Sequence, residues 1–113
     1  MIERGEVWLA ELDEPRDSEP GFRRPVVVVQ ADTFNRSRIG TVVCVVCTSN
    51  LALADAPGNT VITKRESGLP KDSVVNVSQF ITADRGALLE RAGKLPPRAR
   101  DRVDRGLRLV LEL

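Results

Sequence analysis

Two valine-rich stretches decide the fold: Pro25-Val-Val-Val-Val-Gln30 and Thr41-Val-Val-Cys-Val-Val-Cys-Thr48. Both are short apolar runs rich in β-branched residues, a pattern typical of buried strands. A proline is tolerated at the first position of a strand, because its missing N–H need not interrupt the hydrogen-bond ladder. The sequence therefore predicts two buried strands, at 25–30 and 41–47.

The second stretch contains the chain's two cysteines in a Cys-x-x-Cys spacing. In a strand that rises roughly 3.3 Å per residue, Cys44 and Cys47 point to opposite faces. Their Cα atoms are then about 10 Å apart, beyond the roughly 7 Å limit for a disulfide. We interpret both as small buried side chains rather than a redox pair or half of a zinc site.

Weaker patterns on either side of these stretches predict further elements. The expected strands lie at 6–12, 60–63, 73–77 and 79–82, with a weaker one near 90–94. The expected connections are a polar loop at 13–21, a single helical turn within 31–38, a mobile loop of about ten residues at 49–59 and a turn at 67–72.

The C-terminal segment predicts an amphipathic helix. Pro97 fits the first turn of a helix, where its missing N–H costs nothing. One apolar stripe at helical spacing follows, made of Ala99, Val103, Leu107, Val110 and Leu111. A run of short strands closed by one helix predicts a mainly β (α+β) fold, a small antiparallel β barrel capped at one end. At 113 residues, we expect one domain spanning 1–113.

Composition narrows the possible chemistry. Histidine and tyrosine are absent, so catalysis has to use carboxylates, cations, hydroxyls, thiols or backbone dipoles. No cluster of metal ligands is visible, and we expect neither a metal nor another cofactor.

No apolar run approaches the roughly 18 residues that cross a bilayer, and residues 1–6 lack the apolar region of a signal peptide. We expect a cytoplasmic protein without membrane contact.

Polar groups gather at the ends of the two central strands. A polar loop, residues 17–22, leads into Arg23 and Arg24 at the start of one strand. Thr48, Ser49 and Asn50 follow the end of the other. If the strands are neighbours, these two ends form a single site.

Several short motifs occur in one order along nearly the whole chain. They are Arg4-Gly5-Glu6-Val7-Trp8, Ser18-Glu19 followed by Arg24-Pro25, Asn35-Arg36, Cys47-Thr48-Ser49, Gly68-Leu69-Pro70-Lys71-Asp72-Ser73 and the region of Gln79. Each motif is weak alone, but together the chain resembles the MazF/PemK family of bacterial toxins.

This resemblance implies an SH3-like (PemK-like) barrel, a homodimer and a sequence-specific, metal-independent endoribonuclease. The implied substrate is single-stranded RNA, in the first place messenger RNA with ribosomal or transfer RNA as alternatives, and its cleavage inhibits translation and growth. The resemblance also implies a MazE-like antitoxin, and we hypothesise that an extended acidic and apolar segment of it covers the RNA groove.

In the family, the arginine of the Arg-Pro pair and the threonine after the central strand are catalytic, and they match Arg24 and Thr48. A guanidinium suits the role, since its planar donors match phosphate and it stays charged. RNA can be cut without a metal when its own 2′-hydroxyl attacks the adjacent phosphorus. Glu19 and solvent are the two candidates for accepting the proton of that hydroxyl. The remaining candidates for holding RNA are Ser18, Arg23, Asn35, Arg36, Ser49, Asn50 and Gln79. Arg23 is expected to face away from Arg24, because successive strand residues alternate.

The chain departs from the family pattern in two places. Asp17 and Pro20 flank Ser18-Glu19 where glycine and glutamine are usual, and Ser78 and Ile81 stand near Gln79 where charged residues are common. We expect these changes to affect RNA preference more than activity.

Two other functions fit a small barrel. A CcdB-like toxin binds gyrase without catalysis, but Leu109 to Leu113 lacks the exposed aromatic tail expected of that group. A peptide-binding SH3-like module needs an aromatic groove, and the chain has four aromatic residues in total, three Phe and one Trp.

Overall fold

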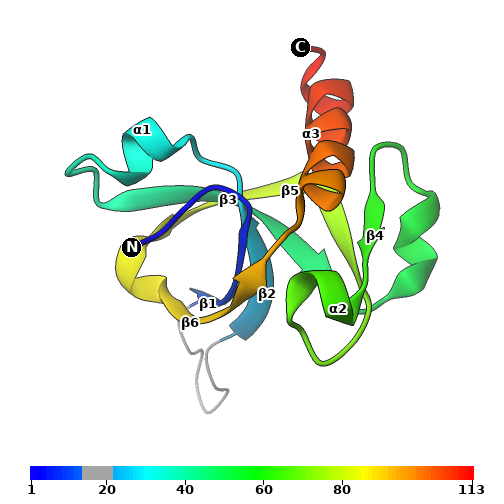
Figure 1. The fold of residues 1–113 in the computed structure, drawn as a ribbon, viewed down its shortest axis with the longest axis horizontal. Coiled ribbons are helices and arrows are strands. Elements are labelled where there is room, and N and C mark those ends of the chain that lie inside the picture. Colours follow the sequence, from blue (N-terminus) through cyan, green and yellow to red (C-terminus); the bar gives the residue numbers. More distant parts are fainter. Residues whose placement is uncertain (14–21) are drawn as a thin grey trace.

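The computed structural model describes residues 1–13 and 22–113, and its centre is the pairing of the two valine-rich strands. Strand β2 (Phe22–Val28) runs antiparallel to β3 (Thr41–Thr48), with Val26 opposite Val46 and Val28 opposite Cys44. These strands occupy the middle of a six-stranded sheet in the order β4-β5-β3-β2-β1-β6. The sheet curls around itself, with α3 packed across it (Figure 1).

The other strands pair outward from this centre. They are β1 (Glu6–Asp13), β4 (Thr60–Ile62), β5 (Ser73–Asp84) and β6 (Leu88–Lys94). The helical elements are α1 (Asp32–Asn35), η1 (Leu51–Asp55), α2 (Lys64–Ser67), η2 (Arg85–Ala87) and α3 (Pro97–Leu111). The predicted mainly β fold with a C-terminal helix is confirmed, as are the central strands and the single helical turn.

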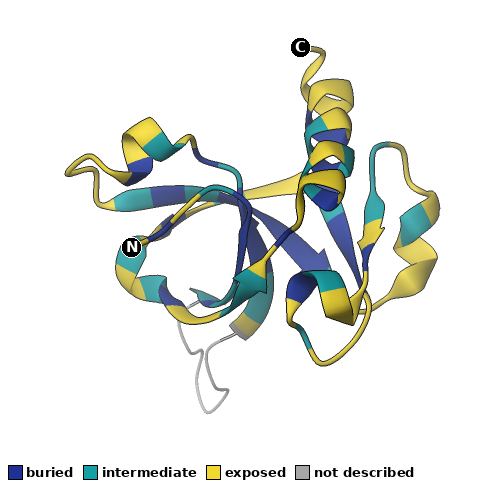
Figure 2. Cartoon of the chain, viewed as in Figure 1, coloured by how far each residue is buried: buried dark blue, intermediate teal, exposed yellow. Residues whose placement is uncertain are grey.

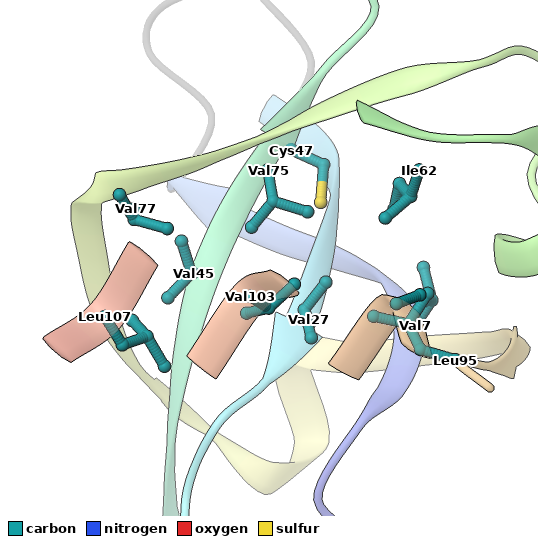
Figure 3. Close-up of a cluster of buried hydrophobic side chains, with 11 residues drawn as sticks. Val7, Val27, Val45, Cys47, Ile62, Val75, Val77, Leu95, Val103 and Leu107 are labelled. Atoms are coloured by element: carbon teal, nitrogen blue, oxygen red, sulfur yellow. The ribbon is translucent and has the colours of Figure 1, made fainter. Parts of the chain in front are cut away.

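Both faces of β2 and β3 are covered, which explains their continuous apolar sequence. On one face, Val27 and Val45 pack against Val103 and Leu107 of α3 (Figure 3). On the other face, inside the curl of the sheet, the buried side chains are Ile2, Ala10, Val26, Val28, Val42, Cys44, Val46 and Leu88. Each face therefore has its own hydrophobic core, and burial of a valine contributes about 1.5–3 kcal/mol.

The two cysteines divide between these cores, as the alternation of strand residues predicts. Cys47 belongs to the core beneath α3 and Cys44 to the core inside the curl, and both are fully buried. Burial raises the pKa of each thiol to about 12. Both thiols are free and stay protonated at neutral pH.

Local structure differs from the expectations in three places. The segments 73–77 and 79–82 form one strand, β5, which bends at a register shift opposite Val45 and Cys47. Because of this bend, Val77 contributes to the core beneath α3, whereas Ile81 packs against the core inside the curl. The expected 49–59 loop contains η1, capped by Asn50, and the turn at 67–72 begins with the last residue of α2.

The apolar stripe of α3 is buried only in its first half. Ala99, Val103 and Leu107 are buried, but Val110 and Leu111 are 40% and 50% exposed. Figure 2 shows the end of this helix exposed where it extends past the sheet. No helix in the described ranges is long and apolar enough to cross a membrane.

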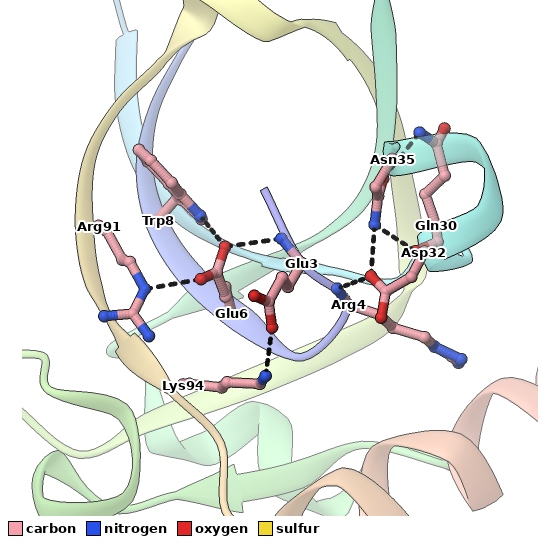
Figure 4. Close-up of polar contacts among 9 residues, drawn as sticks. All are labelled: Glu3, Arg4, Glu6, Trp8, Gln30, Asp32, Asn35, Arg91 and Lys94. Carbon is pink, nitrogen blue, oxygen red and sulfur yellow. Dashed lines mark hydrogen bonds and ion pairs between the residues drawn. The ribbon is translucent and has the colours of Figure 1, made fainter. Parts of the chain in front are cut away.

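Polar contacts fasten the N-terminal segment to the curl (Figure 4). The buried Glu6 carboxylate accepts hydrogen bonds from the Glu3 N–H at 2.8 Å, the Trp8 indole at 3.1 Å and Arg91 Nε at 2.7 Å. Burial alone raises the pKa of Glu6, but these donors outweigh it and hold the pKa below its usual value. Glu6 is therefore ionised at neutral pH.

Gly68 closes α2 in a left-handed conformation with a φ of 78°, and a Cβ there would overlap the Ala92 carbonyl. We expect Gly68→Ala to lower the free energy of unfolding by about 2–4 kcal/mol, from the left-handed strain and the overlap together. Gly86→Ala is the matched control, because the space around Gly86 is open. Urea unfolding measures both, and equal stability of the two variants would contradict this close approach of α2 to β6.

Candidate functional site

Antiparallel pairing brings Arg24 and Thr48 together. Val26 lies opposite Val46 in the β2–β3 register, and two more steps along each strand bring Arg24 opposite Thr48. On the other side of β3, Thr48 is paired with Val74 at the start of β5. The ends of three neighbouring strands, β2, β3 and β5, therefore meet at one place, as the sequence predicted for β2 and β3.

A cavity of about 300 Å³ lies where these strand ends meet. Its polar and charged lining residues are Arg23, Arg24, Thr48, Ser49, Lys71 and Ser73, and its apolar lining includes Pro25, Leu69 and Pro70. Among the described residues that line it, none is acidic. The two arginines and the lysine among the described lining residues give a hollow suited to an anion such as a phosphodiester.

Thr48 is positioned by the backbone that follows it. Its Oγ1 accepts a hydrogen bond from the Asn50 N–H at 3.2 Å, which leaves the hydroxyl proton available for donation. The Asn50 side chain in turn accepts the Ala52 N–H at 3.2 Å and caps η1. Asn50 thus fixes the local backbone around Thr48 rather than lining the cavity.

Lys71 and Ser73 are cavity residues that the sequence did not indicate as functional. Ser73 is buried, and its hydroxyl donates to the Lys71 carbonyl at 3.2 Å. The Asp72 carboxylate accepts the Lys64 N–H at 2.8 Å and ties the same turn to α2. The motif 68–73 was visible in the sequence, but its position beside Thr48 depends on the pairing of β5 with β3.

Arg23 also lines the cavity. It lies within β2, which begins at Phe22, so strand alternation would point its side chain to the opposite face from Arg24. The site lies at the end of the strand, where residues from both faces can reach the same hollow. Arg23 is exposed, whereas Arg24 is half-buried. Arg23 was expected to face away from Arg24, but both line the cavity, and the difference that the structure shows between them is one of burial.

The remaining candidates lie elsewhere. Asn35 is 2% exposed, and its amide exchanges hydrogen bonds with Gln30 and donates to Asp32 (Figure 4). This side chain holds α1 in place and is not available to RNA. Arg36 follows α1 at the opposite end of β2, and Gln79 is exposed on β5 outside the cavity lining. Ser18 and Glu19 lie outside the described residues.

The cavity offers charge and hydrogen-bond donors rather than a nucleophile. Cys47 lines it, but its protonated, buried thiol is unreactive at neutral pH. In the described ranges, no three His, Cys, Asp or Glu side chains gather as metal ligands would. The described residues can bind a phosphate and stabilise negative charge developing on its oxygens.

Comparison with known proteins gives one consistent family. The profile of PemK-like, MazF-like toxins of type II toxin–antitoxin systems matches residues 3–111. Endoribonuclease MazF2 of Mycobacterium bovis and endoribonuclease MazF6 of Mycobacterium tuberculosis are each 46% identical over 113 residues, covering 100% of this chain and 99% of theirs.

Solved structures show the same fold. An endoribonuclease in complex with its cognate antitoxin, from a mycobacterial species, superposes with a TM-score of 0.82 at 20% identity, covering 100% of this chain and 97% of that one. A MazE–MazF structure from Deinococcus radiodurans has a TM-score of 0.79 at 19% identity, covering 99% and 96% of the two chains.

Proposed function

The chain belongs to the PemK-like, MazF-like toxins of type II toxin–antitoxin systems, and on that premise we propose that its cationic cavity cuts single-stranded RNA. The chain is the endoribonuclease toxin of such a pair, and residues 1–113 act as a single toxin domain in the cytoplasm. The observation that supports this site is the meeting of Arg24, Thr48 and Lys71 in one cavity, whose described lining residues include no acidic side chain.

In the proposed reaction, the nucleophile and the leaving group both belong to the RNA. The only other groups that take part in bond making are those that accept and donate protons. The 2′-oxygen attacks the adjacent phosphorus and loses its proton, the bond from phosphorus to the 5′-oxygen breaks, and the leaving oxygen gains a proton. The products are a cyclic phosphate and a 5′-hydroxyl. Negative charge builds on the phosphoryl oxygens in the transition state, and donors fixed beside them lower the barrier.

Arg24 is proposed as the main fixed cation and Thr48 as a second hydrogen-bond donor. One preorganised donor of this kind lowers the barrier by about 3–4 kcal/mol. Arg24 is a poor base, since deprotonating a group with a pKa above 12 at neutral pH costs on the order of 7 kcal/mol. Glu19 and solvent remain the candidates for accepting the 2′-proton, and Ser18, Arg23 and Ser49 for holding the strand.

The cognate antitoxin is proposed to compete with RNA for this cavity. An acidic segment complements Arg23, Arg24 and Lys71, and apolar residues can pack on Leu69 and Pro70. Inhibition by occupancy then requires no change in the structure of the toxin.

We also propose a homodimer that covers the exposed end of α3. A groove of about 580 Å³ lies between α1, β3, β5 and this helix end, and its exposed apolar side chains include Phe34, Ile39, Phe80, Leu111 and Leu113. Its rim carries Arg4, Asp104 and Arg108. A patch with a hollow, projecting leucines and charges of both signs can pair with a second copy of itself about a two-fold axis.

Cleavage of RNA by the purified chain in excess chelator tests the catalytic proposal. We expect 5′-hydroxyl and cyclic phosphate ends, with cleavage about 100- to 1,000-fold slower in Arg24→Ala and clearly slower in Thr48→Ala. Arg23→Ala should weaken cleavage less, and Arg98→Ala, an exposed change on α3, should leave the rate unchanged. Intact RNA across varied sequences, together with inhibition of gyrase, would favour the CcdB-like alternative instead.

Light scattering after size-exclusion chromatography tests the homodimer. The wild-type chain should elute with twice the 12.4 kDa mass of one chain, and Leu111→Asp should shift it towards the monomer. Leu89→Asp is the control, because Leu89 is exposed on β6 away from the groove. A monomeric wild type, or equal dissociation by both variants, would rule out this interface.

A further inference from the structure

A second hollow adjoins the catalytic cavity and shares part of its wall. It measures about 300 Å³ and is lined by Ser49, Leu51, Lys64, Pro70, Lys71 and Asp72. Ser49, Pro70 and Lys71 line both hollows. The two hollows therefore lie side by side, and together they define a track from Arg24 past Lys71 to Lys64 on α2.

The charge of this track favours a polyanion along its whole length. Among the described lining residues, the cationic side chains are Arg23, Arg24, Lys71 and Lys64, and Asp72 carries the one carboxylate. The Asp72 carboxylate is already engaged by the Lys64 N–H at 2.8 Å. Neither lysine ammonium forms an ion pair within residues 1–13 and 22–113.

Several contacts hold this part of the track in place. Thr63 and Glu66 form a reciprocal capping box at the start of α2, with bonds of 3.1 and 3.0 Å. Glu66 also accepts two hydrogen bonds of 3.0 Å from Arg102 of α3. Because α2 is tied to α3, the backbone that carries Lys64 is preorganised rather than adaptable.

The second hollow also has an apolar wall. Leu51 of η1 is 51% exposed and borders it beside the two lysines. A nucleotide has an anionic phosphate and a base with apolar faces, so a hollow lined by two lysines and an exposed leucine matches both parts. A free phosphate or an acidic side chain would make no use of Leu51.

From these observations we propose that Lys64 and Lys71 form a phosphate-binding subsite for the nucleotide next to the cleavage position. RNA passes from the catalytic cavity over Lys71 to Lys64, and Lys71 contacts the backbone between the two hollows. This subsite rests on the proposed ribonuclease function and extends it. Lys64 and Lys71 act as binding residues, and Lys64 does not take part in the reaction itself.

The salt dependence of RNA binding tests the subsite. The probe is a mixed-sequence 12-nucleotide RNA with 2′-O-methyl groups, which cannot be cut because the attacking hydroxyl is blocked. In plots of log affinity against log salt concentration, Lys64→Gln and Lys71→Gln should each reduce the slope by about 0.7. Lys64→Arg and Lys71→Arg should keep the wild-type slope, since they preserve the charge.

Arg65→Gln is the matched control. Arg65 is exposed on the same turn of α2, forms no ion pair in the described part of the chain, and lines neither hollow. Its substitution should leave the slope unchanged. Equal losses in Lys64→Gln and Arg65→Gln would show general attraction to a basic surface and would overturn the subsite.

Cleavage kinetics separate this proposal from the proposed function. With an RNA substrate that the wild type cuts, Lys64→Gln should raise KM about fivefold and leave kcat unchanged. If the wild type cuts RNA and Lys64→Gln has the wild-type KM and salt slope, the subsite is wrong and the ribonuclease stands. If the wild type cuts no RNA, the proposed function fails first.

Discussion

The pairing of β2 with β3 is the constraint on which the rest of the structure depends. Valines on both faces of these strands are buried, so a slip of one residue would move every side chain into the opposite core. The register that keeps Val27 against Val45, extended two residues past its last pair at Val26 and Val46, places Arg24 opposite Thr48, and both line the cavity. The positions of Arg24 and Thr48 therefore follow from the packing of the valines further along the same two strands.

The other side of the cavity is held by a different set of contacts. Ser73 and Asp72 fix the turn that carries Lys71, and the capping box of α2 supports that turn. Arg102 connects α2 to α3, which itself covers the core beneath β2 and β3. A fixed cation is useful in catalysis because it needs no rearrangement when charge develops. The same polar contacts thus serve stability and the proposed chemistry.

Prediction from sequence succeeded where a residue's place follows from its own strand. The central strands, the opposite directions of Cys44 and Cys47 and the shared edge of Arg24 and Thr48 all follow from alternation and antiparallel pairing. Lys71 was missed because its position depends on β5 pairing with β3 across the 24 residues between the two strands, 49–72. Asn35 was misjudged because an asparagine at a turn has the same sequence signature whether it contacts RNA or its own backbone.

The end of α3 shows a second limit of prediction from sequence. Periodicity predicted an apolar stripe down to Leu111, and the stripe exists, but the sheet ends before the helix does. Sequence reports that a surface is apolar and does not report what covers it. In this chain the exposed half of the stripe borders the groove proposed for the second copy.

The most direct measurement is a map of amide chemical shifts in labelled protein titrated with the uncleavable 2′-O-methyl RNA. If three strand ends form the RNA site, the largest changes will cluster at residues 23–24, 48–49 and 71–73, with little change at 32–36 of α1. Changes centred on α1 and the groove beside α3, with the strand ends silent, would contradict the account.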